Sequence, residues 1–250
     1  MLYQKSSSIG NIYPIKEEIM LTKNLFLPVP SVCFKNKNIA QSHLYQARSP
    51  LELKFVFALV AHAMMIRTVD KSNELSFKLS LSNISSKKGL FGSKKLGGND
   101  VRKLLRNIEH PYIRIDKPIE HQATEVEYSL TKQYIDDLFK KMTHNKNITL
   151  SELMGYKNIS AIKAHMQIAY FKCYKISFYG AVDFFDISED ASRSNQLIAI
   201  KRILKSAKNG KIPFYYGETN NPNTRYTIVT ERLDDYQFFE GLEIQTFDDD

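Results

Sequence analysis

The sequence predicts an α+β fold in which two small units of the same design follow one another along the chain. The protein has 250 residues, of which 43% are hydrophobic, and this is enough for two domains with buried cores. Only 10 glycines occur, which disfavours a large all-β fold, because such folds use glycine in many turns. The order helix, strand, helix, helix, hairpin can be traced twice in the hydrophobic pattern. We therefore expect two mixed units in tandem.

The first unit is predicted between residues 46 and 131, and it begins with a long apolar helix over 51–66. Ser49 suits the cap of that helix and Pro50 suits its first position. A strand and a short helix are expected next, at 74–79 and 80–86.

The following helix, which we expect Asn99 or Asp100 to cap, is amphipathic. Its apolar residues recur at helical spacing and its basic residues fall on the other face. The two sets are Val101, Leu104, Leu105 and Ile108, and Arg102, Lys103 and Arg106. Two β-like runs at 112–116 and 125–130 then predict a hairpin.

The same order begins again between residues 148 and 230. Helices are expected at 159–176 and 196–207, a strand at 182–187, and hairpin strands at 212–217 and 224–229. The remaining segments are an irregular N-terminal arm at 1–45, a connecting helix at 132–147 and an acidic tail at 231–250. Because this is the element order of a winged-helix domain, the sequence predicts two tandem winged-helix domains joined by a connecting helix.

A second interpretation of the 149–163 region stays open. The run from Thr149 to Glu152 has the pattern of a capping box, and Gly155 follows it. Together with the helix from Ile159, this predicts a helix-turn-helix in which the helix with Lys163 and His165 enters the DNA groove.

The charge of the chain predicts a polyanionic partner. The formal net charge is +8, yet residues 231–250 hold eight acidic residues and one arginine, so the other 230 residues carry +15. A helix that is apolar on one face and basic on the other suits the major groove of double-stranded DNA, where Arg reads guanine and Lys neutralises phosphate. The candidate DNA-binding residues are Lys94, Lys95, Asn99, Arg102, Lys103, Arg106, Arg114, Lys117, Arg193, Asn195, Lys201, Arg202, Lys205, Lys208, Lys211 and Arg225.

Candidate catalytic motifs each lack a required residue. The loop from Gly92 to Asn99 has no Lys-Ser/Thr pair after its second glycine, so it does not match a P-loop. Glu52 and Lys54 have the spacing of a nuclease motif, but they lie in a predicted helix and not in a strand. The six histidines form no metal-binding pattern. We expect no enzyme activity, no catalytic residues, no metal and no cofactor.

The cellular setting is predicted from cysteine usage and hydropathy. The chain has two cysteines, Cys33 and Cys173, which cannot form a disulfide framework and suit a reducing cytoplasm. The longest apolar stretch, 55–66, is too short to span a bilayer, so we expect no membrane association.

The arrangement resembles a known family. Ala47 to Lys54 (ARSPLELK) opens the first long helix, and Ser160 to Lys163 (SAIK) opens the first helix of the second unit. Over roughly residues 45 to 230, these motifs and the element order resemble the plasmid replication initiators that bind repeated origin sequences, or iterons, through tandem winged-helix domains.

The resemblance implies sequence-specific binding at a plasmid or mobile-element origin, a homodimeric state and contact with host replication proteins. A phage or plasmid transcriptional regulator with the same DNA-binding parts is an alternative. A non-catalytic module that binds protein, with solvated basic faces, is an alternative of another class.

Overall fold

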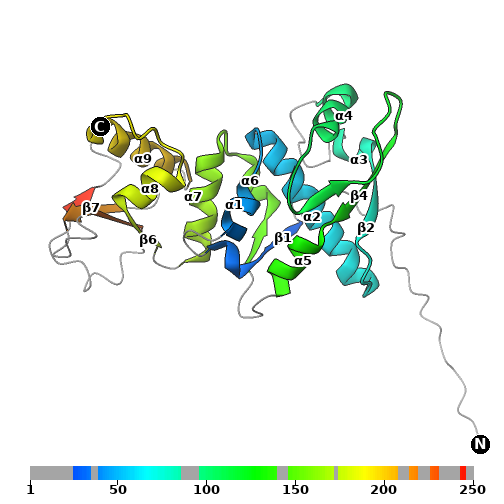
Figure 1. Ribbon diagram of the computed structural model, residues 1–250, viewed down its shortest axis with the longest axis horizontal. Helices are drawn as coiled ribbons and strands as arrows, with labels where there is room; N and C mark the ends of the chain where they lie inside the picture. Colours follow the sequence, from blue (N-terminus) through cyan, green and yellow to red (C-terminus); the bar gives the residue numbers. More distant parts are fainter. Residues whose placement is uncertain are drawn as a thin grey trace, which may run out of the picture.

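The computed structural model describes residues 25–34, 39–85, 96–139, 146–171, 174–207, 214–218, 226–230 and 243–245. It has the predicted α+β fold, with helices and three small antiparallel sheets. Figure 1 shows an elongated molecule with one group of elements at each end and a middle section between them. The middle section contains β1 (Phe26–Val29), α1 (Ile39–Tyr45), β5 (Lys146–Thr149), α6 (Leu150–Met154) and α7 (Ile159–Tyr170).

The first unit follows the predicted order closely. Its elements are α2 (Pro50–Asp70), β2 (Ser76–Ser80), α3 (Leu81–Ser85), α4 (Gly98–Arg106), β3 (Ile113–Ile115) and β4 (Glu125–Leu130). The three strands form an antiparallel sheet of order β2-β4-β3, which confirms the predicted hairpin. Ser49 caps α2 as expected, because its side chain accepts a hydrogen bond from the Glu52 amide. The predicted cap of α4 is wrong: Gly97 is the N-cap, so Asn99 and Asp100 lie in the first turn.

The second unit repeats this order at the other end of the molecule. After α7 come β6 (Tyr174–Ser177), α8 (Phe178–Phe184), α9 (Arg193–Ala207), β7 (Phe214–Glu218), β8 (Tyr226–Thr230) and β9 (Glu243–Gln245). The sheet order is β6-β8-β7-β9, so its first three strands are arranged as in the first unit. The paired strands β7 and β8 confirm the second predicted hairpin.

The predicted strand at 182–187 and the predicted end of the helix at Ile176 are both wrong. The helix α7 ends at Tyr170, and the strand that follows is β6. Ser177 then caps α8, because its side chain accepts a hydrogen bond from the Gly180 amide. By periodicity alone, a short apolar run such as 181–185 fits a strand and a buried helix equally well. Here the Ser177 cap favours the helix.

The prediction of an irregular arm is wrong for residues 26–34 and 39–45. The strand β1 pairs antiparallel with β5, in a register that places Phe26 opposite Thr149 and Val29 opposite Lys146. A short 3₁₀ helix, Ser31–Phe34, and α1 follow β1. Prolines 28 and 30 suggested a break, but Pro28 sits in a two-stranded sheet where an edge position tolerates a missing amide hydrogen. Residues 1–24 and 35–38 of the predicted arm lie outside the described residues.

The helix predicted at 132–147 is present as α5 (Lys132–Phe139), in which Tyr134 and Leu138 are buried, but the prediction is wrong for residues 146 and 147, which belong to the strand β5. The chain then passes through β5 and α6 before the second unit begins. Residues 140–145, which the prediction assigned to this connection, lie outside the described residues.

Two hydrophobic clusters form the cores, and α7 contributes to both. Ile162 and Met166 of α7 pack into the large core around α2, the β2-β4-β3 sheet and β1. Ala164, on another face of α7, packs into the second core with Phe178 and Ile200. The two units are therefore joined by a shared, buried helix.

Polar contacts also link the two units across α6. The Lys54 ammonium, which is buried on α2, donates to the carbonyls of Met154 (2.8 Å), the last residue of α6, and Tyr156 (2.5 Å), two residues later. The Tyr156 hydroxyl donates to the carbonyl of Ala207, the last residue of α9, and lies 2.9 Å from Nδ1 of His165. We refer to these contacts as the Lys54–Tyr156 bridge. The bridge connects the core helix of the first unit to the end of α9.

In the part of the chain that the structure describes, no single helix combines the length and apolar character needed to cross a membrane. Among the described helices, α1 and α2 taken together, across a bend of 105°, meet that criterion by length and composition.

Candidate nucleic-acid interface

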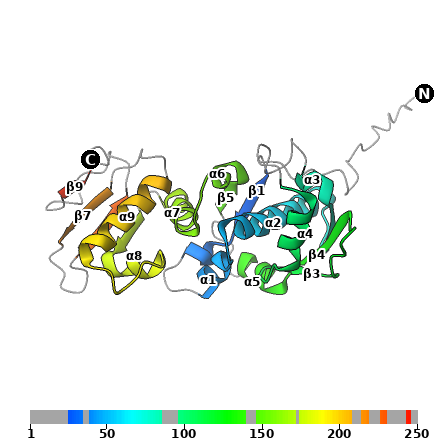
Figure 2. The same cartoon turned by 90° about the horizontal axis from the view of Figure 1, so that it is seen from above.

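The helices α4 and α9 occupy equivalent places in the two units and lie on the same side of the molecule. Figure 1 shows both along its upper side, near opposite ends of the long axis, and Figure 2 views that side directly. Each helix follows a short helix and precedes a hairpin in the chain. The two helices that carry most of the candidate DNA-binding residues therefore lie on one side of the molecule.

In α4, the apolar face holds the helix on the first core. Val101 and Leu105 are fully buried, whereas Asn99 and Lys103 are exposed on the opposite side. The one acidic residue on α4, Asp100, lies in its first turn, where a carboxylate interacts favourably with the helix dipole.

Two arginines of α4 bind the chain that connects β3 to β4. The Arg102 guanidinium donates from Nε to the Ala123 carbonyl (2.9 Å) and from Nη1 to Asn99 Oδ1 (3.2 Å). The Arg106 guanidinium donates from Nε to the Ile119 carbonyl at 2.5 Å. These contacts fix the hairpin beside α4. Since a guanidinium carries five N–H donors, each arginine keeps others that can bind a phosphate.

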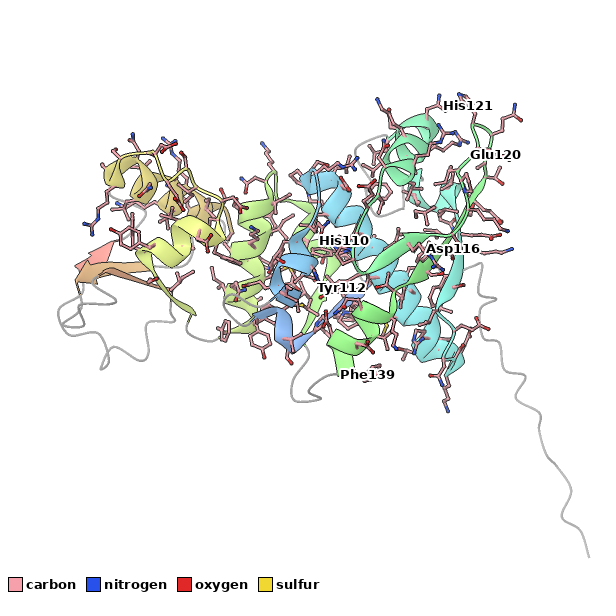
Figure 3. The ribbon with its side chains drawn as sticks, viewed as in Figure 1. His110, Tyr112, Asp116, Glu120, His121 and Phe139 are labelled. Atoms are coloured by element: carbon pink, nitrogen blue, oxygen red, sulfur yellow. The ribbon has the colours of Figure 1, made fainter. Side chains whose placement is uncertain are left out.

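The hairpin tip projects on the same side as α4. Figure 3 shows Glu120 and His121 at this tip and Asp116 lower down, at the base of the hairpin. Both tip residues are exposed. The tip therefore carries one acidic side chain, which the predicted basic wing did not include.

The basic residues predicted for the first hairpin are held in ion pairs. Arg114, whose side chain is 74% exposed, pairs with Asp116 at 3.1 Å. Lys117 and Lys78 both pair with Glu127, at 2.6 and 3.2 Å, and their hydrogen bonds lower the pKa of that carboxyl. Arg114 thus has one carboxylate partner, whereas Lys117 and Lys78 share a single carboxylate, and both Arg114 and Lys117 remain exposed.

In α9, a cationic face lies opposite a buried face. Gln196, Ile200 and Leu204 are buried against the second core. At 100° per residue, the centre of the opposite face holds Asn195, Ile198, Arg202 and Lys205. The chain has no acidic residue between Arg193 and Ala207.

Two further predicted residues lie at the edges of α9. Arg193, its first residue, is exposed and places its guanidinium 5.4 Å from the centre of the Phe178 ring, which anchors the start of the helix. Lys201 is half-buried at the flank of the cationic face. The structure therefore brings together Arg193, Asn195, Lys201, Arg202 and Lys205 on one helix.

Five candidates, Lys94, Lys95, Lys208, Lys211 and Arg225, lie outside the described residues. Sequence reasoning missed Ile198, an exposed apolar residue in the middle of the cationic face of α9. Its spacing from Asn195 and Arg202 was a signal that a helical projection would have revealed. The contacts of Arg102 and Arg106 with hairpin carbonyls had no local sequence signal.

The alternative helix-turn-helix at 149–163 is wrong as a groove-binding element. The capping box exists, because the Thr149 amide donates to Glu152 Oε1 at 3.1 Å and the Thr149 side chain caps α6. Although burial raises the pKa of the Glu152 carboxyl, the hydrogen bonds from Thr149 lower it overall. However, Lys163 and His165 are only 9% and 5% exposed, so this face of α7 cannot enter a groove.

Glu52 and Lys54, which have the spacing of a nuclease motif, lie in the helix α2 as expected. Glu52 lies in the first turn of α2, where its carboxylate accepts a hydrogen bond from the Arg48 amide at 3.0 Å. Lys54 belongs to the Lys54–Tyr156 bridge. In the described parts of the chain, no group of three or more His, Cys, Asp or Glu residues is placed to hold a metal ion.

Comparison with protein-family models and with curated proteins gives no match for this chain.

Proposed function

We propose that this chain binds double-stranded DNA through two winged-helix domains, each of which presents its third helix to the duplex. The supporting observation is that α4 and α9 lie on one side of the molecule, at equivalent places in two units of the same element order, and that each has exposed cationic or polar residues opposite its buried face. The strand orders β2-β4-β3 and β6-β8-β7 are those of a winged-helix sheet. In this proposal the domains span about residues 46–131 and 148–230.

The chemistry of the two faces suits the major groove. That groove is about 12 Å wide and admits an α-helix, and its base edges are read by Arg and Asn side chains. Lys and the remaining Arg side chains neutralise phosphates and release counterions, which supplies affinity that does not depend on sequence. The contribution of α4 is mainly of this second kind, because Lys103 is an exposed cation and both Arg102 and Arg106 are committed in part to the hairpin.

Within this class, we propose a replication initiator at a plasmid or mobile-element origin. The two segments that resemble such initiators, 47–54 and 160–163, open α2 and α7, the first helices of the two units. A homodimer, contact with host replication proteins and a cytoplasmic location belong to the same proposal.

The DNA-binding proposal is tested by fluorescence anisotropy with a labelled duplex between about 50 and 200 mM salt. Each phosphate contact should contribute about −0.9 to the slope of log affinity against log salt. Lys103→Ala should reduce the steepness of that slope by about one unit. Lys132→Ala removes the same charge from exposed α5, on the lower side of Figure 1, and should leave the slope unchanged. Weak binding that does not depend on salt would favour the protein-interaction module instead.

The initiator proposal is tested separately with the DNA that flanks the gene. Tandem repeats there should be bound and should support replication of a plasmid that carries them. Binding to a promoter operator without replication would favour the transcriptional regulator.

A further inference from the structure

An isoleucine lies at the centre of the cationic face of α9. The Ile198 side chain is 43% exposed, and the helix repeat places it between Asn195, three residues before, and Arg202, four residues after. All three lie opposite the buried face formed by Gln196, Ile200 and Leu204. A single exposed apolar residue needs no explanation by itself, but this one occupies the part of the helix that would enter the groove.

The major groove offers one apolar group that such a residue can contact. Thymine carries a 5-methyl group there, and no other base presents a methyl. Asn pairs in bidentate fashion with adenine, and Arg pairs in the same way with guanine. Asn195, Ile198 and Arg202 therefore supply three different kinds of base contact along one helical stripe.

The length of the stripe sets the length of the sequence it reads. Seven residues separate Asn195 from Arg202, which corresponds to a rise of about 10 Å along the helix. Base pairs are about 3.4 Å apart, so the stripe spans about three of them. The equivalent part of α4 differs, because Asn99 accepts a hydrogen bond from Arg102 and Lys103 is a cation that favours phosphate.

We propose that Asn195, Ile198 and Arg202 read a segment of about three base pairs that contains a thymine, whose methyl group packs against Ile198. This inference rests on the proposed DNA-binding function and names the residues that determine its specificity. The occupant of the face is DNA because α9 carries four cations and no acid from Arg193 to Ala207.

The test begins with selection of the preferred duplex from a random library by the full-length protein. Each thymine of that duplex is then replaced in turn by deoxyuridine, which removes only the methyl group. We expect one position at which this replacement weakens binding by about fourfold, the value for loss of one buried methyl. In Ile198→Ala the same replacement should have no effect at that position.

Two other variants separate base reading from general affinity. Asn195→Ala should lose discrimination at a neighbouring adenine by about 5- to 150-fold. Lys103→Ala should weaken binding to all duplexes alike and retain the thymine effect. Because Ile198 is exposed, its alanine variant should unfold at the same temperature as the wild type, which circular dichroism can verify.

The two proposals fail in different ways. If the protein binds duplexes but Ile198→Ala and the wild type respond identically to every deoxyuridine, the inference about Ile198 is overturned and DNA binding stands. If no duplex is bound with salt-dependent affinity, the DNA-binding proposal is overturned and this inference with it.

Discussion

Replacing Lys54 by methionine removes the charged end of the Lys54–Tyr156 bridge and keeps its apolar stem. The ammonium donates to two carbonyls, at 2.8 and 2.5 Å, and the residue is 8% exposed. A hydrogen bond from a charged donor contributes about 1.5–3 kcal/mol, so two contribute at least about 3 kcal/mol. Because methionine is uncharged, the variant avoids the desolvation cost of a buried ammonium, and this offsets part of the lost hydrogen-bond energy. We expect a net destabilisation of about 2 kcal/mol.

Urea denaturation followed by circular dichroism measures this change as a lower midpoint with an unaltered slope. The matched control is Lys132→Met, an exposed lysine at the start of α5, where the change should stay within about 0.5 kcal/mol. If Lys54→Met and Lys132→Met unfold at the same urea concentration, the reasoning is refuted, and the carbonyls of Met154 and Tyr156 do not depend on Lys54.

Three further predictions concern the first unit. Burial lowers the pKa of His110 from its ordinary value of 6.5 to about 4. Between these two pH values the imidazole binds a proton in the unfolded chain but not in the folded protein. Stability should therefore fall by up to about 3 kcal/mol from pH 6.5 to 4, and His110→Gln should flatten this fall in urea titrations at each pH. Tyr112→Phe removes the hydroxyl that donates to buried Asp137 at 2.9 Å, and equilibrium unfolding should show a loss of about 1–3 kcal/mol. Arg102→Ala releases the Ala123 carbonyl, so hydrogen exchange should accelerate at the hairpin tip and not in the rest of the sheet.

Elements with strong local signals were predictable from the sequence. Ser49 and Pro50 mark the start of α2, and both act as the capping rules require. The two hairpins followed from alternating strands around turn residues. In each case, the residues that decide the structure are neighbours in the chain.

Elements decided by distant contacts were not predictable in this way. The strand β1 exists because it pairs with β5, about 120 residues later, and a four-residue segment with a proline gives little sign of that partner. The boundary between α7 and β6 was misplaced because the apolar run continues past Tyr170, where the helix stops.

The candidate site shows the same division. The sequence predicted a helix at 196–207 and named Arg202 and Lys205 as candidates, and the structure shows both exposed on α9. The charge pattern of α4 could not show that Arg102 and Arg106 reach hairpin carbonyls, because those acceptors lie 21 and 13 residues away. Likewise, the strand register brings Glu127 close to Lys117, whereas Asp116, the partner of Arg114, is only two residues away in the chain.

The helix α7, which supplies Ile162 and Met166 to one core and Ala164 to the other, makes the two halves inseparable. A fragment that ends before Ile159 loses two buried side chains from its own interior. A fragment that begins there exposes the same two side chains to water. We therefore expect neither half to fold on its own, so that the two units of repeated element order cannot be cut apart and recombined.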